Sequence, residues 1–338
     1  MMMDDQIKKP RAYWHPVALS KSLKRAKPLR IMLGGMAYAL FRTTAGGIGC
    51  VKDICPHRFA RFSEGKVVGG EVQCPYHGCK FNAQGRCTEI PVHNGEVPNR
   101  FVKNLAAREQ DGLIYVTDDK DSAGEPHQLK WDDQPYVRRI IENKVGTSLV
   151  NVAENVLDPT HTLFVHKGLM RGLTDKTSRV TIDVNGNQER IDIKFSGEDV
   201  QNGIVSRLLE GKRSYSTGSF ELPGIVEIEY WANGKMKLAN TLMFSKIDEN
   251  TTRGFAVLTA PRQFGLGFVK AAVFIPLLKH IIKQDRVMMD MSHENWEANG
   301  RPNRAMSPTD FVRPNIEAIM SGITPPAAIN PVRIVYEL

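Results

Sequence analysis

Two pairs of cysteine and histidine stand close together between residues 55 and 77. One residue separates Cys55 from His57, and two residues separate Cys74 from His77. Two thiolates and two imidazoles can hold a zinc ion, or a [2Fe–2S] cluster in which one iron takes both thiolates and the other takes both imidazoles. Zinc sites usually place at least two residues between paired ligands and group like ligands together. The mixed pairs therefore favour the cluster, and structural zinc remains the alternative.

A second set of candidate ligands lies in the stretch "NVAENVLDPTHTLFVHKGLM", where His161 and His166 follow Glu154 and Asp158. Two histidines and one carboxylate bind non-haem Fe(II) on one face and leave the other positions open for O2 and substrate. A gap of five residues turns a regular helix through about 500°, which leaves the two side chains about 140° apart. If both histidines bind one ion, the helix must deform or unwind between them.

Together these patterns resemble the Rieske non-haem iron oxygenases. The sequence "CPHR", followed after a short interval by "CPYHG", resembles the Rieske cluster motif. The spacing N-x-x-D-x-x-H with a second histidine five residues on resembles the iron-binding signature of the oxygenase large subunits, and it is matched by Asn155, Asp158, His161 and His166. The resemblance implies that this chain carries both a Rieske cluster and a mononuclear iron.

The resemblance also assigns the ligands. It implies that Cys55 and Cys74 hold one cluster iron and that His57 and His77 hold the other. For the mononuclear iron it implies the two downstream histidines and one distant carboxylate.

That third ligand is expected in the C-terminal stretch "KQDRVMMDMSHENW", which offers Asp285, Asp290 and Glu294. Members of the family typically place another acid five residues after the ligand aspartate. Asp285 is therefore the expected ligand, and Asp290 is the alternative. The competing interpretation for both acids is a solvated helix face.

Asp158 has two possible roles. Because Pro159 follows it, Asp158 could be an N-cap residue with proline at the first helical position. The family resemblance implies instead a bridge between a Rieske histidine of one subunit and an iron histidine of the next, here His77 and His161. Asp158 and Asn155 are on this basis the expected catalytic residues, and a homotrimer or a multiple of three is the expected assembly.

Two departures from related motifs are informative. High-potential Rieske proteins carry an extra cysteine in each cluster loop, but those neighbourhoods read "RFA" after His57 and "PY" after Cys74 in this chain. The cluster is therefore expected to be of the lower-potential kind that serves oxygenases. Cys79 stands where oxygenases of the family usually have tryptophan. Cys50 and Cys87 are interpreted as small buried hydrophobic residues.

The stretches around these motifs predict an α+β protein. Short β-like segments with glycine-rich turns fill residues 29–118, which indicates an all-β module. The resemblance implies that it is an N-terminal Rieske domain, over residues 10–120. An acidic, proline-bearing linker is expected at 121–136. Alternating patterns after it predict a helix-grip-like catalytic domain over 137–338, with an antiparallel sheet and flanking helices around 148–168 and 268–298.

Composition and charge indicate the cellular location and the kinds of partner. Five cysteines, an odd number, favour metal ligation over a disulfide framework, and no apolar secretion segment opens the chain, so a cytoplasmic location is expected. The apolar stretch 264–283 is interrupted by charged residues and proline, which predicts a core helix and no stable membrane span. Residues 8–30 hold eight lysines or arginines and no acid, so an acidic partner could dock there; a solvated basic face is the competing interpretation. Nucleic acid is not expected, because aromatic residues are not interleaved with these charges.

By this resemblance the chain is expected to be a terminal oxygenase. Electrons would come from a flavin reductase or ferredoxin, pass through the cluster to the mononuclear Fe(II), and serve to hydroxylate or demethylate an aromatic or cyclic small organic substrate with O2. NAD(P)H would act only through the partner, because no G-x-G-x-x-G fingerprint is present.

The "WHPVA" start and the "EANGRP" stretch resemble the demethylase and chlorophyllide or pheophorbide a oxygenase branch. Monooxygenation is therefore favoured over ring cis-dihydroxylation. The alternative from another class is a Rieske electron-transfer protein without oxygenase activity.

Overall fold

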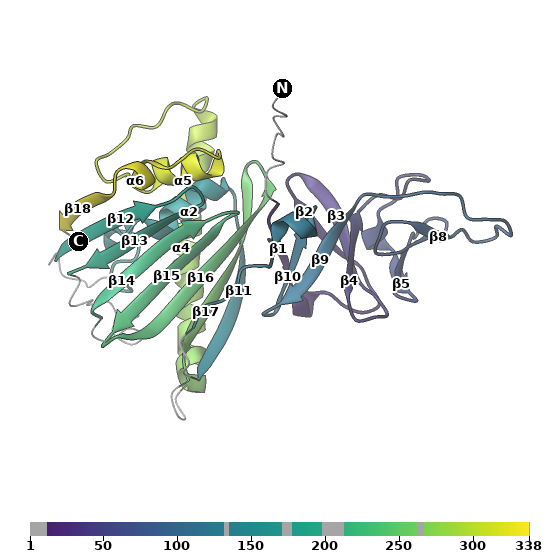
Figure 1. Ribbon diagram of the computed structural model, residues 1–338, viewed down its shortest axis with the longest axis horizontal. Helices are drawn as coiled ribbons and strands as arrows, with labels where there is room; N and C mark the ends of the chain where they lie inside the picture. Colours follow the sequence, from purple (N-terminus) through teal and green to yellow (C-terminus); the bar gives the residue numbers. More distant parts are fainter. Residues whose placement is uncertain (1–11, 132–134, 171–177, 198–212, 263–266, 338) are drawn as a thin grey trace, which may run out of the picture. The chain divides into compact units, whose positions relative to one another are not determined.

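The chain divides into two compact units, residues 1–128 and 129–338. The computed structural model describes residues 12–131, 135–170, 178–197, 213–262 and 267–337, with the side chains of 267–274 left out. Strands dominate both units, and most helices belong to the second (Figure 1). The predicted α+β organisation is confirmed. The predicted linker 121–136 includes residues 132–134, which lie outside the described residues, and its limits stay a prediction.

The larger sheet of the N-terminal unit forms the support for the cluster loops. Its described part has six antiparallel strands, in the order β1 (His15–Leu19), β10 (Leu113–Thr117), β9 (Asn104–Gln110), β4 (Ile48–Lys52), β3 (Met36–Arg42) and β2 (Leu29–Leu33). All residues of β10 are buried, since its sequence LIYVT is apolar or small throughout. The first cluster loop follows β4 of this sheet.

A smaller antiparallel sheet of the same unit carries or adjoins Cys74, Cys79 and Cys87. In the described residues it contains β5 (Lys66–Val68), β6 (Glu71–Gln73), β7 (Lys80–Phe81) and β8 (Cys87–Glu89). The rings of Phe62 and Phe81 meet edge to face at 4.9 Å in its core. The short helical segments of this unit are η1 (Ser20–Ser22), η2 (Phe62–Glu64) and α1 (Lys120–Ala123).

The C-terminal unit is built on one antiparallel sheet. The described strands follow the order β11 (Tyr136–Val145), β17 (Thr251–Pro261), β16 (Lys235–Asp248), β15 (Ile225–Ala232), β14 (Tyr215–Glu221), β13 (Arg190–Ser196), β12 (Arg179–Gly186) and β18 (Val332–Glu337). Asn233 and Gly234 join β15 to β16 with φ of 54° and 70°, as a type I′ hairpin turn requires. The last strand, β18, pairs with β12 at the edge of the same sheet.

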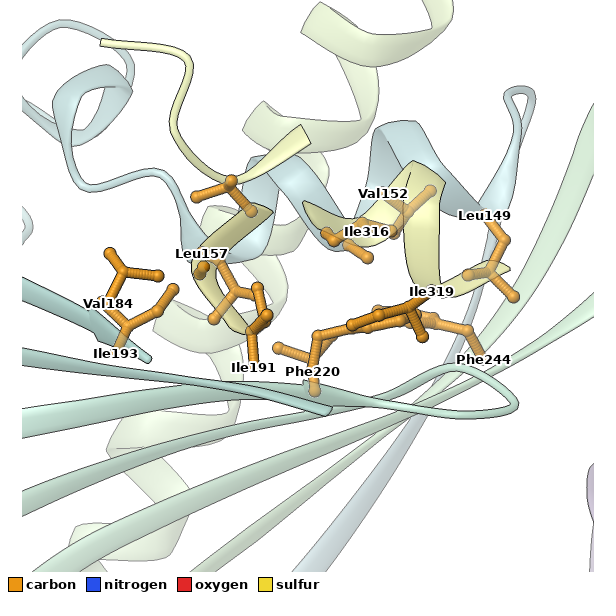
Figure 2. Packing of buried hydrophobic residues seen from close by; sticks show 14 of the residues in the cluster. Leu149, Val152, Leu157, Val184, Ile191, Ile193, Phe220, Phe244, Ile316 and Ile319 are labelled. Carbon is orange, nitrogen blue, oxygen red and sulfur yellow. The ribbon is translucent and has the colours of Figure 1, made fainter. Parts of the chain in front are cut away.

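Helices cover one face of this sheet. They are α2 (Leu149–Leu157), α4 (Gly267–Ala298), α5 (Arg313–Met320) and α6 (Pro326–Ile329), with the short η3 (Thr160–Leu163) after α2. In Figure 2, Leu157 of α2 and Ile319 of α5 point toward Ile191 and Phe220 of the sheet. These side chains belong to one buried cluster that fixes α2 on the sheet.

The helix predicted over 148–168 is wrong in extent, because α2 ends at Leu157. The side chain of Ser148 accepts the Asn151 N–H at the start of α2. At the other end Asp158 is extended, with φ −80° and ψ 114°, since the residue before a proline avoids helical geometry. The helix predicted at 268–298 is confirmed as α4. In the part of the chain that the structure describes, no helix has the length and apolar character to cross a membrane.

Replacing Phe220 by alanine tests this packing. Phe220 is fully buried, so Phe220→Ala should lower the free energy of unfolding by about 3–5 kcal/mol. Val335→Ala, at a side chain that is 44% exposed, should change it by less than about 0.5 kcal/mol. Urea unfolding followed by tryptophan fluorescence measures both. A Phe220→Ala loss below about 1 kcal/mol would contradict the assigned core.

Candidate metal centres

The two cysteine loops of the N-terminal unit share one hydrogen-bond pattern. Cys55 N–H donates to Ala60 O at 2.8 Å, and Phe59 N–H donates to Cys55 O at 2.9 Å. In the second loop Cys74 N–H donates to Cys79 O at 2.9 Å, and the fifth loop residue, a glycine, donates to Cys74 O at 3.1 Å. Each loop therefore closes on its cysteine in the same way, although the histidine follows at a different distance.

A left-handed residue closes each loop at the same position. Phe59 has φ 62° and Gly78 has φ 75°. A Cβ on Gly78 would lie 2.8 Å from Pro91 Cγ, so both the conformation and the space favour glycine there. In the first loop this conformation directs the Phe59 side chain into solvent, where it is 73% exposed.

The four predicted cluster ligands are divided between core and surface. Cys55 and Cys74 are 1% and 3% exposed, whereas His57 and His77 are exposed and their rings lie 4.5 Å apart. Burial, with Cys74 nearby, raises the pKa of the Cys55 thiol to about 12, so metal binding must displace its proton. Two buried sulfur donors beneath two paired imidazoles fit the donor set of a [2Fe–2S] centre with one thiolate-bound and one imidazole-bound iron.

The three other cysteines are buried in the same unit. Cys79 and Cys87 belong to the core that contains the cluster cysteines, and Cys50 is a buried residue of β4 in the larger sheet. Burial raises the pKa of all three thiols, which keeps them protonated. All five cysteines are free. The main chain of Cys79 supports the second cluster loop, because its carbonyl accepts the Cys74 N–H.

In the C-terminal unit, His161, His166 and Asp285 converge. Their candidate ligand atoms all lie within 4.8 Å of one another. Asp285 Oδ1 is 3.0 Å from His166 Nε2 and 3.5 Å from His161 Nε2. The two imidazole rings are 5.2 Å apart and nearly perpendicular. Asp285 comes from α4, so the group joins segments that are more than a hundred residues apart.

A change of backbone path brings the two histidines together. After α2 the chain forms the 3₁₀ segment η3, and His161 O accepts the N–H groups of Phe164 and Val165. His166 O then accepts the N–H groups of Leu169 and Met170 at 3.0 and 3.1 Å. The helix is therefore interrupted around His161, as the five-residue gap requires if both rings are to face one ion.

The charges of this group fit a cation. Asp285 Oδ1 is buried and makes no hydrogen bond in the described structure, although two imidazole nitrogens face it. Burial opposes ionisation of Asp285, but the two adjacent imidazoles outweigh it and lower the pKa to about 2. Burial also opposes protonation of His161, but Asp158 and Asp285 outweigh it and raise the pKa to about 9. Two imidazoles and one carboxylate on one side suit a non-haem Fe(II) ion.

The sequence did not indicate Gln284 as a member of this site. Its Oε1 lies 3.1 Å from His166 Nδ1, and His166 itself is 1% exposed. With Nδ1 as the donor, the lone pair of Nε2 stays available on the side of Asp285. The only signal in the sequence was its position directly before Asp285.

Asp158 uses its two oxygens separately. Oδ1 accepts the N–H and the O–H of Thr160 at 2.7 and 2.6 Å, and Oδ2 lies 3.7 Å from His161 Nδ1. The alternative prediction, that Asp158 is an N-cap with Pro159 at the first helical position, is wrong. Asp158 is the C-cap of α2, and Pro159 is itself the N-cap of η3. Burial opposes ionisation of Asp158, but hydrogen bonds from His161 and Thr160 outweigh this effect, so the pKa of Asp158 lies below its usual value.

The other predicted residues lie apart from the three ligands. Asn155 lines, together with Asp158, a cavity of about 480 Å³ between α2, α4 and residues 304–313. Asp290, the alternative ligand, accepts the Gly146 N–H at 2.7 Å through Oδ1. That oxygen is bound to the backbone just before α2, and Asp290 is not part of the group formed by His161, His166 and Asp285.

Comparisons with known families fit this geometry. Residues 13–121 match the Rieske [2Fe-2S] domain, and residues 145–312 match the vanillate O-demethylase oxygenase C-terminal domain. The chain belongs to the Rieske oxygenases. The N-terminal unit is thus a [2Fe–2S] domain, and the C-terminal unit is an oxygenase catalytic domain whose His, His and Asp group corresponds to a mononuclear iron centre.

Two curated relatives of this chain are named for oxygenase or demethylase activity. The dicamba O-demethylase oxygenase component of Stenotrophomonas maltophilia is 31% identical over 176 residues, 51% of this chain and 51% of that protein. The 4beta-methylsterol monooxygenase of Methylococcus capsulatus is 29% identical over 266 residues, 72% of this chain and 67% of that protein. The chain spans about half or less of the length of several curated relatives it matches.

Solved structures show the same fold. The Pseudomonas putida NdmA structure with caffeine superposes with a TM-score of 0.74 at 19% identity, covering 95% of each chain.

Gln284 can be tested as a positioning residue. Gln284→Leu should weaken Fe(II) binding at the mononuclear site about 10- to 100-fold, because His166 loses the partner that orients its ring. Gln284→Glu, which keeps the acceptor, should bind nearly as well as the unaltered chain. Equilibrium binding to protein freed of its mononuclear metal, with the cluster retained, measures the affinity. Asp290→Asn on the same helix is the matched control, and equal weakening there would contradict the assignment.

Proposed function

We propose that this chain is the terminal oxygenase component of a multicomponent system. It oxidises a methyl or ring carbon of an aromatic or cyclic organic substrate with O2, using electrons that a partner reductase or ferredoxin draws from NAD(P)H. When bound, the cluster supplies single electrons and the mononuclear iron supplies the activation of O2. The observation that carries this proposal is the convergence of His161, His166 and Asp285 in the same chain as the two Cys/His loops.

The proposed roles of the residues follow from their exposure. His57 and His77 form the exposed edge of the cluster site, where electrons enter and leave, while Cys55 and Cys74 hold its buried side. His166 is fully covered, but the side chains of His161 and Asp285 are 17% and 18% exposed. The ligand group is therefore partly open to a small molecule at His161 and Asp285.

Monooxygenation of a methyl group or ring carbon is favoured over cis-dihydroxylation. The relatives are named for O-demethylation, for N1-demethylation of methylxanthine and for oxidation of 4beta-methylsterol. Their substrates share methyl groups on cyclic skeletons. A second function, electron transfer without oxygenase activity, would leave the group around Asp285 without a purpose.

A homotrimer with electron transfer between chains is part of the proposal. Asp158 Oδ2 faces His161, and the Asp158 side chain also lines the open cavity beside α2. That carboxylate is therefore accessible to His77 of another copy, as the family resemblance implies. A cytoplasmic location belongs to the same proposal, and five free thiols support a reducing compartment.

Metal analysis tests the function directly. Anaerobically purified protein should contain about three irons and two sulfides per chain, and should give a Rieske-type EPR signal after reduction with dithionite. His166→Ala should contain about two irons with the same EPR signal. Two irons in the unaltered chain, unchanged after Fe(II) reconstitution, would indicate an electron carrier. Zinc without sulfide would contradict the proposal.

Mixed oligomers test the path between chains. Cys74→Ser chains lack a complete cluster site and His166→Ala chains lack a complete iron site, so each alone should be inactive. Hybrids of the two should recover O2 uptake with a substrate found by screening methoxy-aromatic, N-methyl and chlorin compounds. Asp158→Asn should abolish this recovery when placed in the Cys74→Ser chain, whose iron receives the electron, and should spare it in the other chain. Hybrids without activity would contradict the path.

A further inference from the structure

A groove in the N-terminal unit carries several positive charges. It has a volume of about 920 Å³ and is lined by residues 20–26, by the turn at 42–46 and by Val67, Gly69 and Gly70. Lys21, Lys24 and Arg25 lie along it and are exposed. We refer to this region, with the neighbouring exposed Lys27, as the basic groove.

These charges are not neutralised within the described residues. No carboxylate there forms an ion pair with the four cations of the basic groove, and Lys24 Nζ instead donates to the backbone oxygen of Lys21 at 3.1 Å. Arg42, which also lines the groove, differs because it pairs with Glu109. The groove therefore presents an excess of positive charge in a chain whose net charge is already +8.

The basic groove is joined directly to the cluster loops. Ala26 O accepts the Val67 N–H at 3.0 Å, which ties the basic segment to β5. Val67 packs against the core that contains Cys55 and Cys74. From Gly70 at the groove, β6 leads to Cys74 in four residues, or about 13 Å of extended chain.

The hairpin at the edge of the groove is held in place. Gly70 has φ 78°, and a Cβ there would lie 2.4 Å from Thr44 N. Its backbone therefore packs directly on the turn at 43–44. The relation between the basic segment and the cluster loops is consequently fixed by main-chain contacts, and a partner bound in the groove would stay at a short distance from Cys74.

We propose that the basic groove is the docking surface for an acidic electron-transfer protein that reduces the cluster. The inference rests on the proposed function, because it assumes a cluster that an external donor must reduce. Complementary charge raises association rates by about 10- to 1,000-fold at low ionic strength, which suits a transient donor. The groove thus holds the donor on the unit that carries the cluster loops.

The shape of the groove favours a protein over other anions. Its cations are exposed, flexible side chains along an open surface, so they suit a broad acidic face better than one small ligand. None of the described residues that line it is aromatic, which removes the stacking platforms that single-stranded nucleic acid uses.

Paired charge reversals test the docking surface. Lys24→Glu/Arg25→Glu changes the net charge by the same amount as the control Lys235→Glu/Lys246→Glu, whose exposed lysines lie on β16 of the other unit. Stopped-flow mixing of each holoprotein with a reduced acidic plant-type [2Fe–2S] ferredoxin gives the second-order rate constant for cluster reduction. At low ionic strength the groove variant should be at least tenfold slower than the unaltered protein and should lose most of its salt dependence. The control should stay within twofold.

Further measurements separate this inference from the proposed function. Iron and sulfide content, and the EPR signal after dithionite reduction, should be unchanged in both variants, because neither pair contacts the cluster loops. Absence of a cluster from the unaltered protein would overturn the proposed function. With the cluster intact, equal rates for the two variants, or no salt-dependent reduction by the ferredoxin, would overturn the docking surface alone.

Discussion

The iron-site geometry of the C-terminal unit depends on the point at which α2 ends. A regular helix through His161 and His166 would separate their side chains by about 140°. Pro159 prevents this, since the residue before it is extended and the chain continues as η3. Asp158 stabilises the break, because one of its oxygens accepts both donors of Thr160. The same residue directs its second oxygen toward His161, so the end of the helix and the setting of the ligand share one carboxylate.

Packing from distant parts of the chain holds α2 in position. Leu149, Val152 and Leu157 meet the sheet and α5 in one core. Arg313, at the start of α5, donates to both carboxylate oxygens of Glu154 on α2, at distances of 2.7–3.1 Å. A bidentate guanidinium–carboxylate pair restricts direction as well as distance. The position of α2, and with it that of the two histidines, therefore depends on contacts with the C-terminal segment.

The cluster ligands are positioned by two short loops instead of by the end of a helix. Its two loops have the same closing hydrogen bonds but carry histidine at different offsets, so the thiols lie in the core while both imidazoles reach the surface. With a cluster bound, the buried thiols would shield one side of it from water and the exposed imidazoles would leave the other side accessible to an electron-transfer partner. The two centres are thus built on separate units, and each obtains its precision from backbone contacts within its own unit.

The sequence by itself determined the donor types. Cys55, His57, Cys74 and His77 were recognisable because metal chemistry restricts residue type and spacing, and the alternating patterns indicated the antiparallel sheet. The family resemblance favoured Asp285 over Asp290 as the distant acid, but only the packing of their common helix decided between them. The sequence also could not reveal Gln284 beside His166, or the early end of α2. These depend on contacts between segments far apart in the chain, which local spacing does not encode.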